Sequence, residues 1–210
     1  LYFAGLRLEQ FYNPALEPEP YYLEALKRDP LDSRANTALG ILELKRGKYT
    51  DAETHLRAAL VRPTRNYTRP KDVEAFYYRG LALQALGRDR DAEDALQRAA
   101  WSSAWEAQAS FELARIASRR GDFAKALELV DRSLATNVRN TRALDLRAAL
   151  LRRLERFKQA TETASQALTI DPLDVMAFRE REVASAALGD STRAADAKRR
   201  RIEIARDAAV

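Results

Sequence analysis

A repeat of 34 residues runs along most of this 210-residue chain and limits what it can fold into. Glycines typical of turns stand at intervals of 40, 34, 34 and 34 residues if Glu155 is counted in the place of the fourth: Gly47, Gly87, Gly121, Glu155 and Gly189. Alanines repeat at the same intervals, at Ala52, Ala92, Ala126, Ala160 and Ala194. A small residue also stands seven positions before each of the first four turns, at Gly40, Gly80, Ala114 and Ala148. Repeats of this length are typical of arrays in which neighbouring units bury a shared core.

Each repeat is predicted to be a hairpin of two helices. In the first full unit the apolar residues follow a 3.6-residue period on both sides of Gly47: Ala38, Leu39 and Leu42 before it, and Ala52, Leu56, Ala59 and Leu60 after it. The small residues let the two helices approach closely. One hairpin cannot bury both of its apolar faces, so successive hairpins must stack. The predicted fold class is therefore all-α.

These residues resemble the tetratricopeptide repeat family. The residues that match its pattern are Leu39, Gly40, Ala52, Leu56 and Ala59; Phe76, Gly80, Ala92, Leu96 and Ala99; Leu113, Ala114, Phe123 and Ala126; and Leu144, Ala148, Phe157, Ala160, Ala167 and Pro172. The resemblance implies a right-handed α-α superhelix, a solenoid whose inner wall is formed by the first helix of every hairpin.

The repeat divides the chain into units of one predicted solenoid, residues 1–210. The units are a degenerate N-terminal repeat 1–31, a repeat 33–72 with a loop insertion at 61–72, three repeats 73–106, 107–140 and 141–174, and a degenerate repeat with a capping helix 175–210. In the last unit Glu182, Lys198 and Arg201 occupy positions that are small or apolar elsewhere. A polar outer face is expected there because a terminal repeat has no further neighbour.

Several segments also resemble a narrower group, large bacterial proteins of unknown function that join such repeats to a mutarotase-like β-sandwich domain. The segments are residues 1–13, 36–40, 75–80 and 100–105. This resemblance implies that the chain is the C-terminal helical part of such a protein. The carbohydrate chemistry it implies would lie outside these residues.

Catalytic, cofactor and metal sites are not predicted. The chain has no cysteine and one histidine, His55, so it offers neither a triad nor a zinc ligand set. We interpret His55 as a partly exposed helix residue. The seven glycines form no phosphate-binding loop. The absence of cysteine fits a reducing compartment, and we predict the cytoplasm.

Membrane and nucleic-acid partners are not predicted either. No apolar run approaches the roughly 18 residues that span a bilayer. The formal net charge is +5, which is small for a nucleic-acid binder. The basic run at residues 198–201 is interpreted as a face of the capping helix, with nucleic-acid binding as an alternative that predicts steeply salt-dependent retention of DNA or RNA.

If the first helices form the inner wall, its exposed stripe follows by stepping three and four residues around each buried small position. The stripe consists of Arg34, Thr37, Ile41 and Leu44; Glu74, Tyr77, Leu81 and Gln84; Gln108, Phe111, Arg115 and Ser118; Arg142, Asp145, Ala149 and Arg152; and Met176 and Arg179. Its N-terminal half is aromatic and aliphatic, and its C-terminal half is rich in arginine.

This stripe predicts a protein-interaction scaffold whose groove holds a peptide or protein segment with apolar and acidic residues. The predicted groove residues are Arg34, Tyr77, Phe111, Arg115, Arg142, Arg152 and Arg179. Alternatively, the arginines pair with neighbouring helices. A second hypothesis makes the chain a structural module that docks on the N-terminal domain of its own longer chain. Trp101 and Trp105 are interpreted as residues that fill the gap between two repeats.

Overall fold

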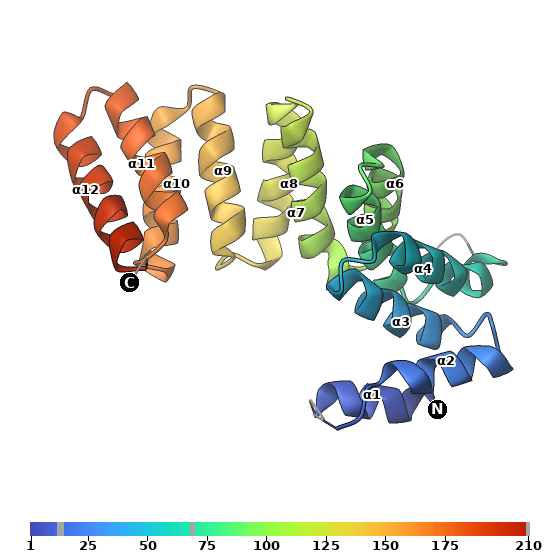
Figure 1. Cartoon of the computed structure of the whole chain (residues 1–210). Helices are drawn as coiled ribbons and strands as arrows, with labels where there is room; N and C mark the ends of the chain where they lie inside the picture. The colour runs from blue at the N-terminus through green and yellow to red at the C-terminus, as the bar shows by residue number, and fades with distance from the viewer. Residues whose placement is uncertain (12–14, 68–69, 209–210) are drawn as a thin grey trace. The chain divides into compact units, whose positions relative to one another are not determined.

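The computed structural model describes residues 1–11, 15–67 and 70–208, and these contain twelve α-helices and no strand (Figure 1). The helices are α1 (Tyr2–Gln10), α2 (Glu19–Arg28), α3 (Ser33–Lys45), α4 (Tyr49–Thr64), α5 (Glu74–Ala85), α6 (Asp89–Ala99), α7 (Ser103–Arg119), α8 (Phe123–Thr136), α9 (Thr141–Arg153), α10 (Phe157–Ile170), α11 (Val175–Ala187) and α12 (Ser191–Asp207). The predicted all-α fold of helical hairpins is confirmed.

The chain forms two compact units, Leu1–Ala109 and Ser110–Val210. In the first unit α1 packs on α2, α3 on α4 and α5 on α6, and each hairpin also contacts the next along the chain. In the second unit α9 packs on α10 and α11 on α12, and α8 contacts α9. That the whole of residues 1–210 is one continuous solenoid stays a prediction.

The turns between paired helices are built alike. Gly47, Gly87, Gly121 and Gly189 have φ values of 72° to 82°, and Glu155 takes the same left-handed conformation with φ 59°. At all five turns the amide of the next residue donates to a carbonyl five residues back, at 2.8 to 3.0 Å. This is the hydrogen bond of a Schellman motif, which closes a helix and reverses the chain. The repeat of turn residues in the sequence is therefore a repeat of backbone conformation.

Two of the small residues lie where paired helices come closest. A Cβ added to Gly40 would stand 2.6 Å from Leu56 Cγ, and one added to Gly80 would stand 2.6 Å from Leu96 Cγ. Gly5 has the same relationship with Tyr22, whose Cε1 would lie 2.6 Å from the added atom. Gly5 therefore has the same kind of contact between α1 and α2 as Gly40 has between α3 and α4.

The core follows the alanine and leucine pattern. Leu39, Leu56, Leu83 and Leu96 are buried in the first unit, whereas Val130, Leu150 and Leu151 form a cluster with several alanines in the second. Carboxylate or amide side chains cap the N-termini of α3, α8, α9, α11 and α12. Such caps satisfy amides that have no partner within the helix.

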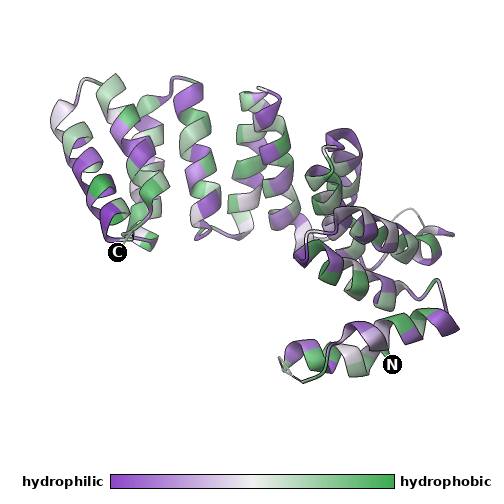
Figure 2. Ribbon diagram, in the orientation of Figure 1, coloured by the Kyte–Doolittle hydropathy of each residue, from purple (hydrophilic) through white to green (hydrophobic). Residues whose placement is uncertain are grey.

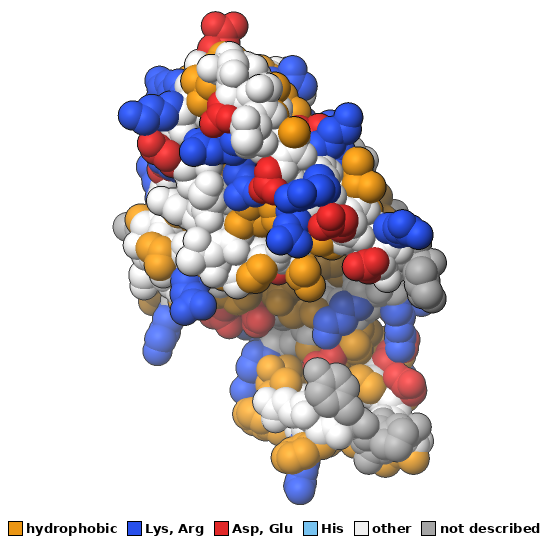
Figure 3. Space-filling model, turned by 90° about the vertical axis from the view of Figure 1, so that its left-hand side faces the viewer, with side chains coloured by type: hydrophobic (Ala, Val, Ile, Leu, Met, Phe, Trp, Pro, Cys, Tyr) orange, Lys and Arg blue, Asp and Glu red, His pale blue; other side chains and the backbone are white. Residues whose placement is uncertain are grey.

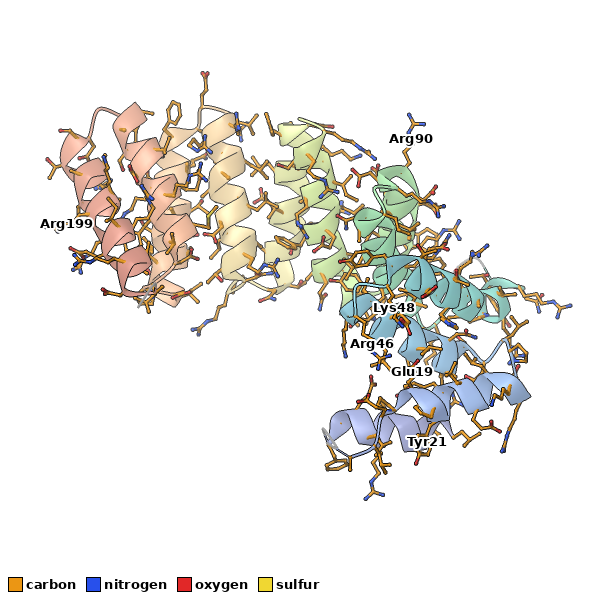
Figure 4. All side chains as sticks on the ribbon, in the orientation of Figure 1. Glu19, Tyr21, Arg46, Lys48, Arg90 and Arg199 are labelled. Carbon is orange, nitrogen blue, oxygen red and sulfur yellow. The ribbon has the colours of Figure 1, made fainter. Side chains whose placement is uncertain are left out.

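Ion pairs join successive hairpins at the surface. Arg46, which follows α3, pairs with Glu19 of α2 (Figure 4). Arg62 of α4 donates two hydrogen bonds, of 2.8 and 2.9 Å, to the carboxylate of Asp29. In contrast, Arg90 extends away from the ribbon (Figure 4), and Arg199 pairs with Asp196 within its own helix, α12.

The final helix has the polar character expected of a cap. Only Ala197 is buried along α12, and Figure 2 shows hydrophilic residues along much of this helix. Arg201 donates to the Glu182 carboxylate at 3.0 Å, so two of the polar residues at small or apolar positions of the repeat satisfy each other. On the face that carries α12, basic and acidic side chains are interspersed with apolar ones (Figure 3).

The loop insertion begins later than predicted. Helix α4 continues to Thr64, with Pro63 in its last turn, so residues 61–64 of the expected loop are helical. A proline removes one amide donor, and near the end of a helix this interrupts little of the hydrogen-bond ladder. Thr68 and Arg69 of the same segment lie outside the described residues.

Candidate functional site

Part of the predicted stripe of the first unit lines a cavity of about 330 Å³, whereas the predicted groove residue Tyr77 is not in its wall. Arg34, Thr37 and Ile41 of α3 and Glu74 of α5 contribute to its wall. The remaining wall comes from Ser33, Ala38, Lys45, Asp72 and Tyr78, and from three residues of α1: Tyr2, Leu6 and Glu9. We call this space the α1–α3–α5 cavity.

The contribution of α1 was missed by the sequence analysis, although a signal for it exists. The stepping rule that yields Arg34, Thr37 and Ile41 around Gly40 also yields Tyr2, Leu6 and Glu9 when it is applied around Gly5. Without the contact between Gly5 and Tyr22, nothing marks Gly5 as the equivalent small position.

Arg34 is held against aromatic rings inside this cavity. Its guanidinium carbon lies 5.2 Å from the centroid of the Tyr2 ring and 5.3 Å from that of Phe3. These distances are typical of cation–π contacts. Arg34 is therefore a wall residue with its own packing partners.

Carboxylates in the α1–α3–α5 cavity are poorly compensated. Glu9 Oε2 accepts a hydrogen bond of 3.2 Å from the Tyr22 hydroxyl, whereas Glu9 Oε1 is buried with no hydrogen-bond partner in the described chain. Burial, and then the charge of Asp72, raises the pKa of Glu74. Burial, followed by the charge of Glu74, also raises the pKa values of Tyr2 and Tyr78.

An aromatic cluster lies on α5 and α7. The Tyr77 ring is 4.9 Å from Trp105 and 5.3 Å from Tyr78, and Tyr78 is 5.8 Å from Trp105. All three side chains are only partly buried. Trp101 lies in the turn before α7 and is 48% exposed, so its interpretation as a gap-filling residue is wrong. Trp105 packs as a half-buried neighbour of the predicted groove residue Tyr77.

Two predicted groove arginines of the second unit are paired within the fold. Arg152 Nε donates to Glu180 Oε2 at 2.6 Å, and Arg115 pairs with Glu112 at 2.8 Å. Both carboxylates are buried. A charge that already neutralises a buried carboxylate is less available to a partner.

The other groove residues of this unit keep more of their surface free. Arg142 lies over the Phe111 ring with its guanidinium carbon 5.7 Å from the centroid. Arg179 is exposed and makes no ion pair with the residues that the structure describes. Of the four predicted arginines here, Arg142 and Arg179 remain suited to binding a carboxylate.

Asp145 lies among acidic neighbours on the same predicted stripe. Burial, and then Asp174, Glu180 and Asp171, raises the pKa of Asp145 to about 7. Its Oδ1 atom is buried and has no hydrogen-bond partner in the described residues. This position is therefore less negative at neutral pH than an ordinary aspartate.

His55 packs on α3, with Nδ1 3.1 Å from Asn36 Oδ1, and burial lowers its pKa.

Within the residues that the structure describes, no three or more acidic, histidine or cysteine side chains are grouped so as to hold a metal ion. None of the helices traced over 1–11, 15–67 and 70–208 has the length and hydropathy of a membrane span.

Comparisons with known proteins find a similar repeat profile and similar solved structures. A profile described as "Tetratricopeptide repeat" matches residues 19–67 and 37–109. Among solved structures, MamA from residue 41 onward, from Desulfovibrio magneticus RS-1, superposes with a TM-score of 0.72 at 19% identity. That match covers 84% of this chain and 96% of the other.

A second solved structure with this fold is that of YrrB, a tetratricopeptide repeat protein described as having "an unusual peptide-binding site". Its TM-score is 0.72 at 16% identity, and the match covers 87% of this chain and 91% of YrrB. At these identities the two structural matches establish the fold alone. They do not establish what this chain binds.

Proposed function

Because this chain has the fold of tetratricopeptide solenoids and residues 19–109 match the repeat itself, we propose that it is a protein-interaction scaffold. In this proposal each of the two units binds a peptide or protein segment, the first along the exposed faces of α1, α3 and α5, and the second along those of α9, α11 and the C-terminal part of α7. It has no catalytic role. The peptide-binding site described for YrrB supports the same class of function.

The observation that carries the proposal is the α1–α3–α5 cavity. One stepping rule, applied around Gly5, Gly40 and Gly80, selects residues of three different helices that line a single space. The partly buried cluster of Tyr77, Tyr78 and Trp105 adds aromatic surface beside it on α5 and α7. Aromatic side chains of this kind are enriched where proteins bind one another.

The segment proposed to bind the first unit has apolar residues, and the segment proposed to bind the second unit also has acidic ones. Arg142 and Arg179 support the acidic preference, because each keeps a guanidinium that no carboxylate of the described residues neutralises. Arg115 and Arg152 support it less, because both already hold buried glutamates. The acidic preference thus depends on two arginines rather than four.

Selection from a random peptide library displayed on phage tests the proposal. Enriched peptides are synthesised, and their affinities are measured by fluorescence anisotropy against the wild type and two charge reversals. Arg34→Glu alters the cavity, and Arg90→Glu makes the same change on α6, where the side chain points away from the fold (Figure 4).

We expect peptides with micromolar affinity whose affinity changes at least about tenfold with Arg34→Glu and is unchanged with Arg90→Glu. A library that yields no enriched peptide would contradict the scaffold function. Equal affinity for the wild type and Arg34→Glu would show that the peptides bind elsewhere than in the cavity.

A second candidate function is a structural module within a larger, carbohydrate-active bacterial protein. Large apolar side chains are exposed on and beside the first two helices, with Phe3 at 68% and Phe11 at 73% and with Leu1, Leu16 and Leu23 also exposed. Exposed apolar side chains at one end of a repeat array favour docking against another domain. The partner in this case is the N-terminal domain of the same chain.

Light scattering and binding measurements with the neighbouring domain test this candidate. Phe3→Ser combined with Leu23→Ser is expected to weaken the association, whereas Ile202→Ser, an exposed site on α12, is not. Under both candidates we place the protein in the bacterial cytoplasm. Immunodetection in fractionated cells checks that location.

A further inference from the structure

We propose that the α1–α3–α5 cavity receives the lysine or arginine side chain of a bound protein segment. This inference rests on the proposed scaffold function and gives one of its contacts a definite chemistry. The cationic side chain proposed for this cavity also differs from the acidic residues proposed as ligands of the second unit.

The first support is the set of carboxylates that the fold leaves unpaired. Glu9 Oε1 is buried without a hydrogen-bond donor, and Glu74 makes no ion pair with the described residues. A buried acceptor without a donor costs free energy, and an incoming cationic donor removes that cost. The cavity therefore contains carboxylate acceptors that lack a cationic donor.

The two cations of the wall do not fill this role. Arg34 is stacked over Tyr2 and Phe3, and neither Arg34 nor Lys45 forms an ion pair with Glu9, Asp72 or Glu74 in the residues that the structure describes. Burial and Asp72 both raise the pKa of Glu74, which a nearby partner cation would oppose. An added cation between Glu9 and Glu74 would meet two carboxylates that have no cationic partner.

The second support is the apolar and aromatic part of the wall. Leu6, Ala38 and Ile41 offer surface for the methylene groups of a long side chain, while Tyr2 and Tyr78 offer rings near its charged end. Lysine and arginine bury their stems on apolar surface and place their heads at polar groups. Tyrosine rings attract such cations, and Arg34 already uses the Tyr2 ring in this way.

The size of the cavity is the third support. About 330 Å³ is at the lower end of the range for ligand pockets, which suits one side chain better than a folded element. The rest of the bound segment would then lie outside, along the exposed face of α5. A carboxylate occupant is disfavoured because the wall carries three carboxylates, Glu9, Asp72 and Glu74, against two cations, Arg34 and Lys45.

A titration followed by ¹⁵N–¹H NMR on the whole 210-residue chain tests the pocket with defined probes. The probes are N-acetyl-lysine methylamide, N-acetyl-arginine methylamide and N-acetyl-norleucine methylamide, the last of which keeps the lysine stem without its charge. The variants are Glu74→Gln and Glu9→Gln, which remove charge at nearly constant shape. Glu24→Gln, on the exposed surface of α2, is the matched control.

We expect the two cationic probes to give saturable shifts at the amides of Leu6, Ile41 and Tyr78, with a dissociation constant in the millimolar range. Norleucine should give no such shifts. Glu74→Gln and Glu9→Gln should each weaken cation binding about fivefold or more, and Glu24→Gln should not. If one of the two cavity variants fails to fold, the other carries the comparison.

The inference is wrong if norleucine shifts the same amides, if the cationic probes do not saturate, or if the folded cavity variants bind lysine as the wild type does. Its outcome is separable from that of the scaffold function. If library peptides bind the wild type and Glu74→Gln with equal affinity, the result would support the scaffold function and contradict the cation pocket. If the lysine probe binds but the library yields no peptide, the result would support the cation pocket and contradict the scaffold function.

Discussion

Arg152 Nε donates to Glu180 Oε2 at 2.6 Å, and this contact joins α9 to α11 across two successive hairpins. The Glu180 side chain is 4% exposed. A residue that the sequence assigned to ligand binding is thus a structural contact between repeats.

Replacing Arg152 with alanine should therefore destabilise the fold. The variant leaves a buried carboxylate unpaired, and we expect the free energy of unfolding in urea to fall by about 2 to 3 kcal/mol. Arg179→Ala, on the exposed surface of α11, should change it by less than about 0.5 kcal/mol. If the two variants are equally stable, the ion pair does not contribute as the structure indicates.

Gly80→Ala should destabilise the first unit through one contact. The added methyl group would stand 2.6 Å from Leu96 Cγ, and such overpacking costs about 1 to 3 kcal/mol, partly offset by the higher helix propensity of alanine. In a Leu96→Ala background the clash is absent, so Gly80→Ala should stabilise that variant. A thermodynamic cycle of the four proteins measures this reversal of sign, and additive effects would contradict it.

Glu155→Gly should stabilise the second unit. Glu155 has φ 59°, and a left-handed conformation costs a non-glycine residue about 1 kcal/mol. After the larger chain entropy of glycine is counted, we expect a gain of about 0.5 kcal/mol in the free energy of unfolding. Glu162→Gly, on the exposed surface in the interior of α10, should give a loss instead. The prediction fails if both glycine variants are less stable than the wild type.

Stability should depend on the protonation of Asp145. Its pKa of about 7 in the folded state lies above that of an unfolded aspartate, so the folded protein binds more protons between about pH 4 and pH 7. The contribution of this group to stability is therefore present at low pH and is lost as the pH rises through 7. Asp145→Asn should therefore gain more stability relative to the wild type at pH 8 than at pH 5. Urea unfolding of both proteins at the two pH values measures this, and a constant difference would argue against the assignment.

Much of the fold could be predicted because the repeated residues act locally. Gly47 and its equivalents mark turns because the left-handed conformation is a property of one residue and its neighbours. Gly40 and Gly80 mark close helix contacts because the partner, Leu56 or Leu96, lies sixteen residues away in the same hairpin. Glu155 could be placed in a turn only by counting from its neighbours, since glutamate itself gives no such signal.

The candidate site was less predictable. The stepping rule found the α3 and α5 walls of the cavity but not α1, because Gly5 could be recognised only by its contact with Tyr22. Trp101 was assigned to the gap between two repeats because it falls at their junction, yet α6 ends at Ala99 and leaves Trp101 in an exposed turn. Helix ends are set by a few residues, and one position decides whether a side chain faces the core.

By itself the sequence determined the hairpin, its turns and the residues that face the interior, because these depend on a period that every unit repeats. Only the tertiary structure decided which charged side chains already have a partner within the fold. Arg152 reaches Glu180 across 28 residues, and Arg142 lies over Phe111 instead. Long side chains choose among several neighbours according to distance and burial, and no spacing along the chain contains that information.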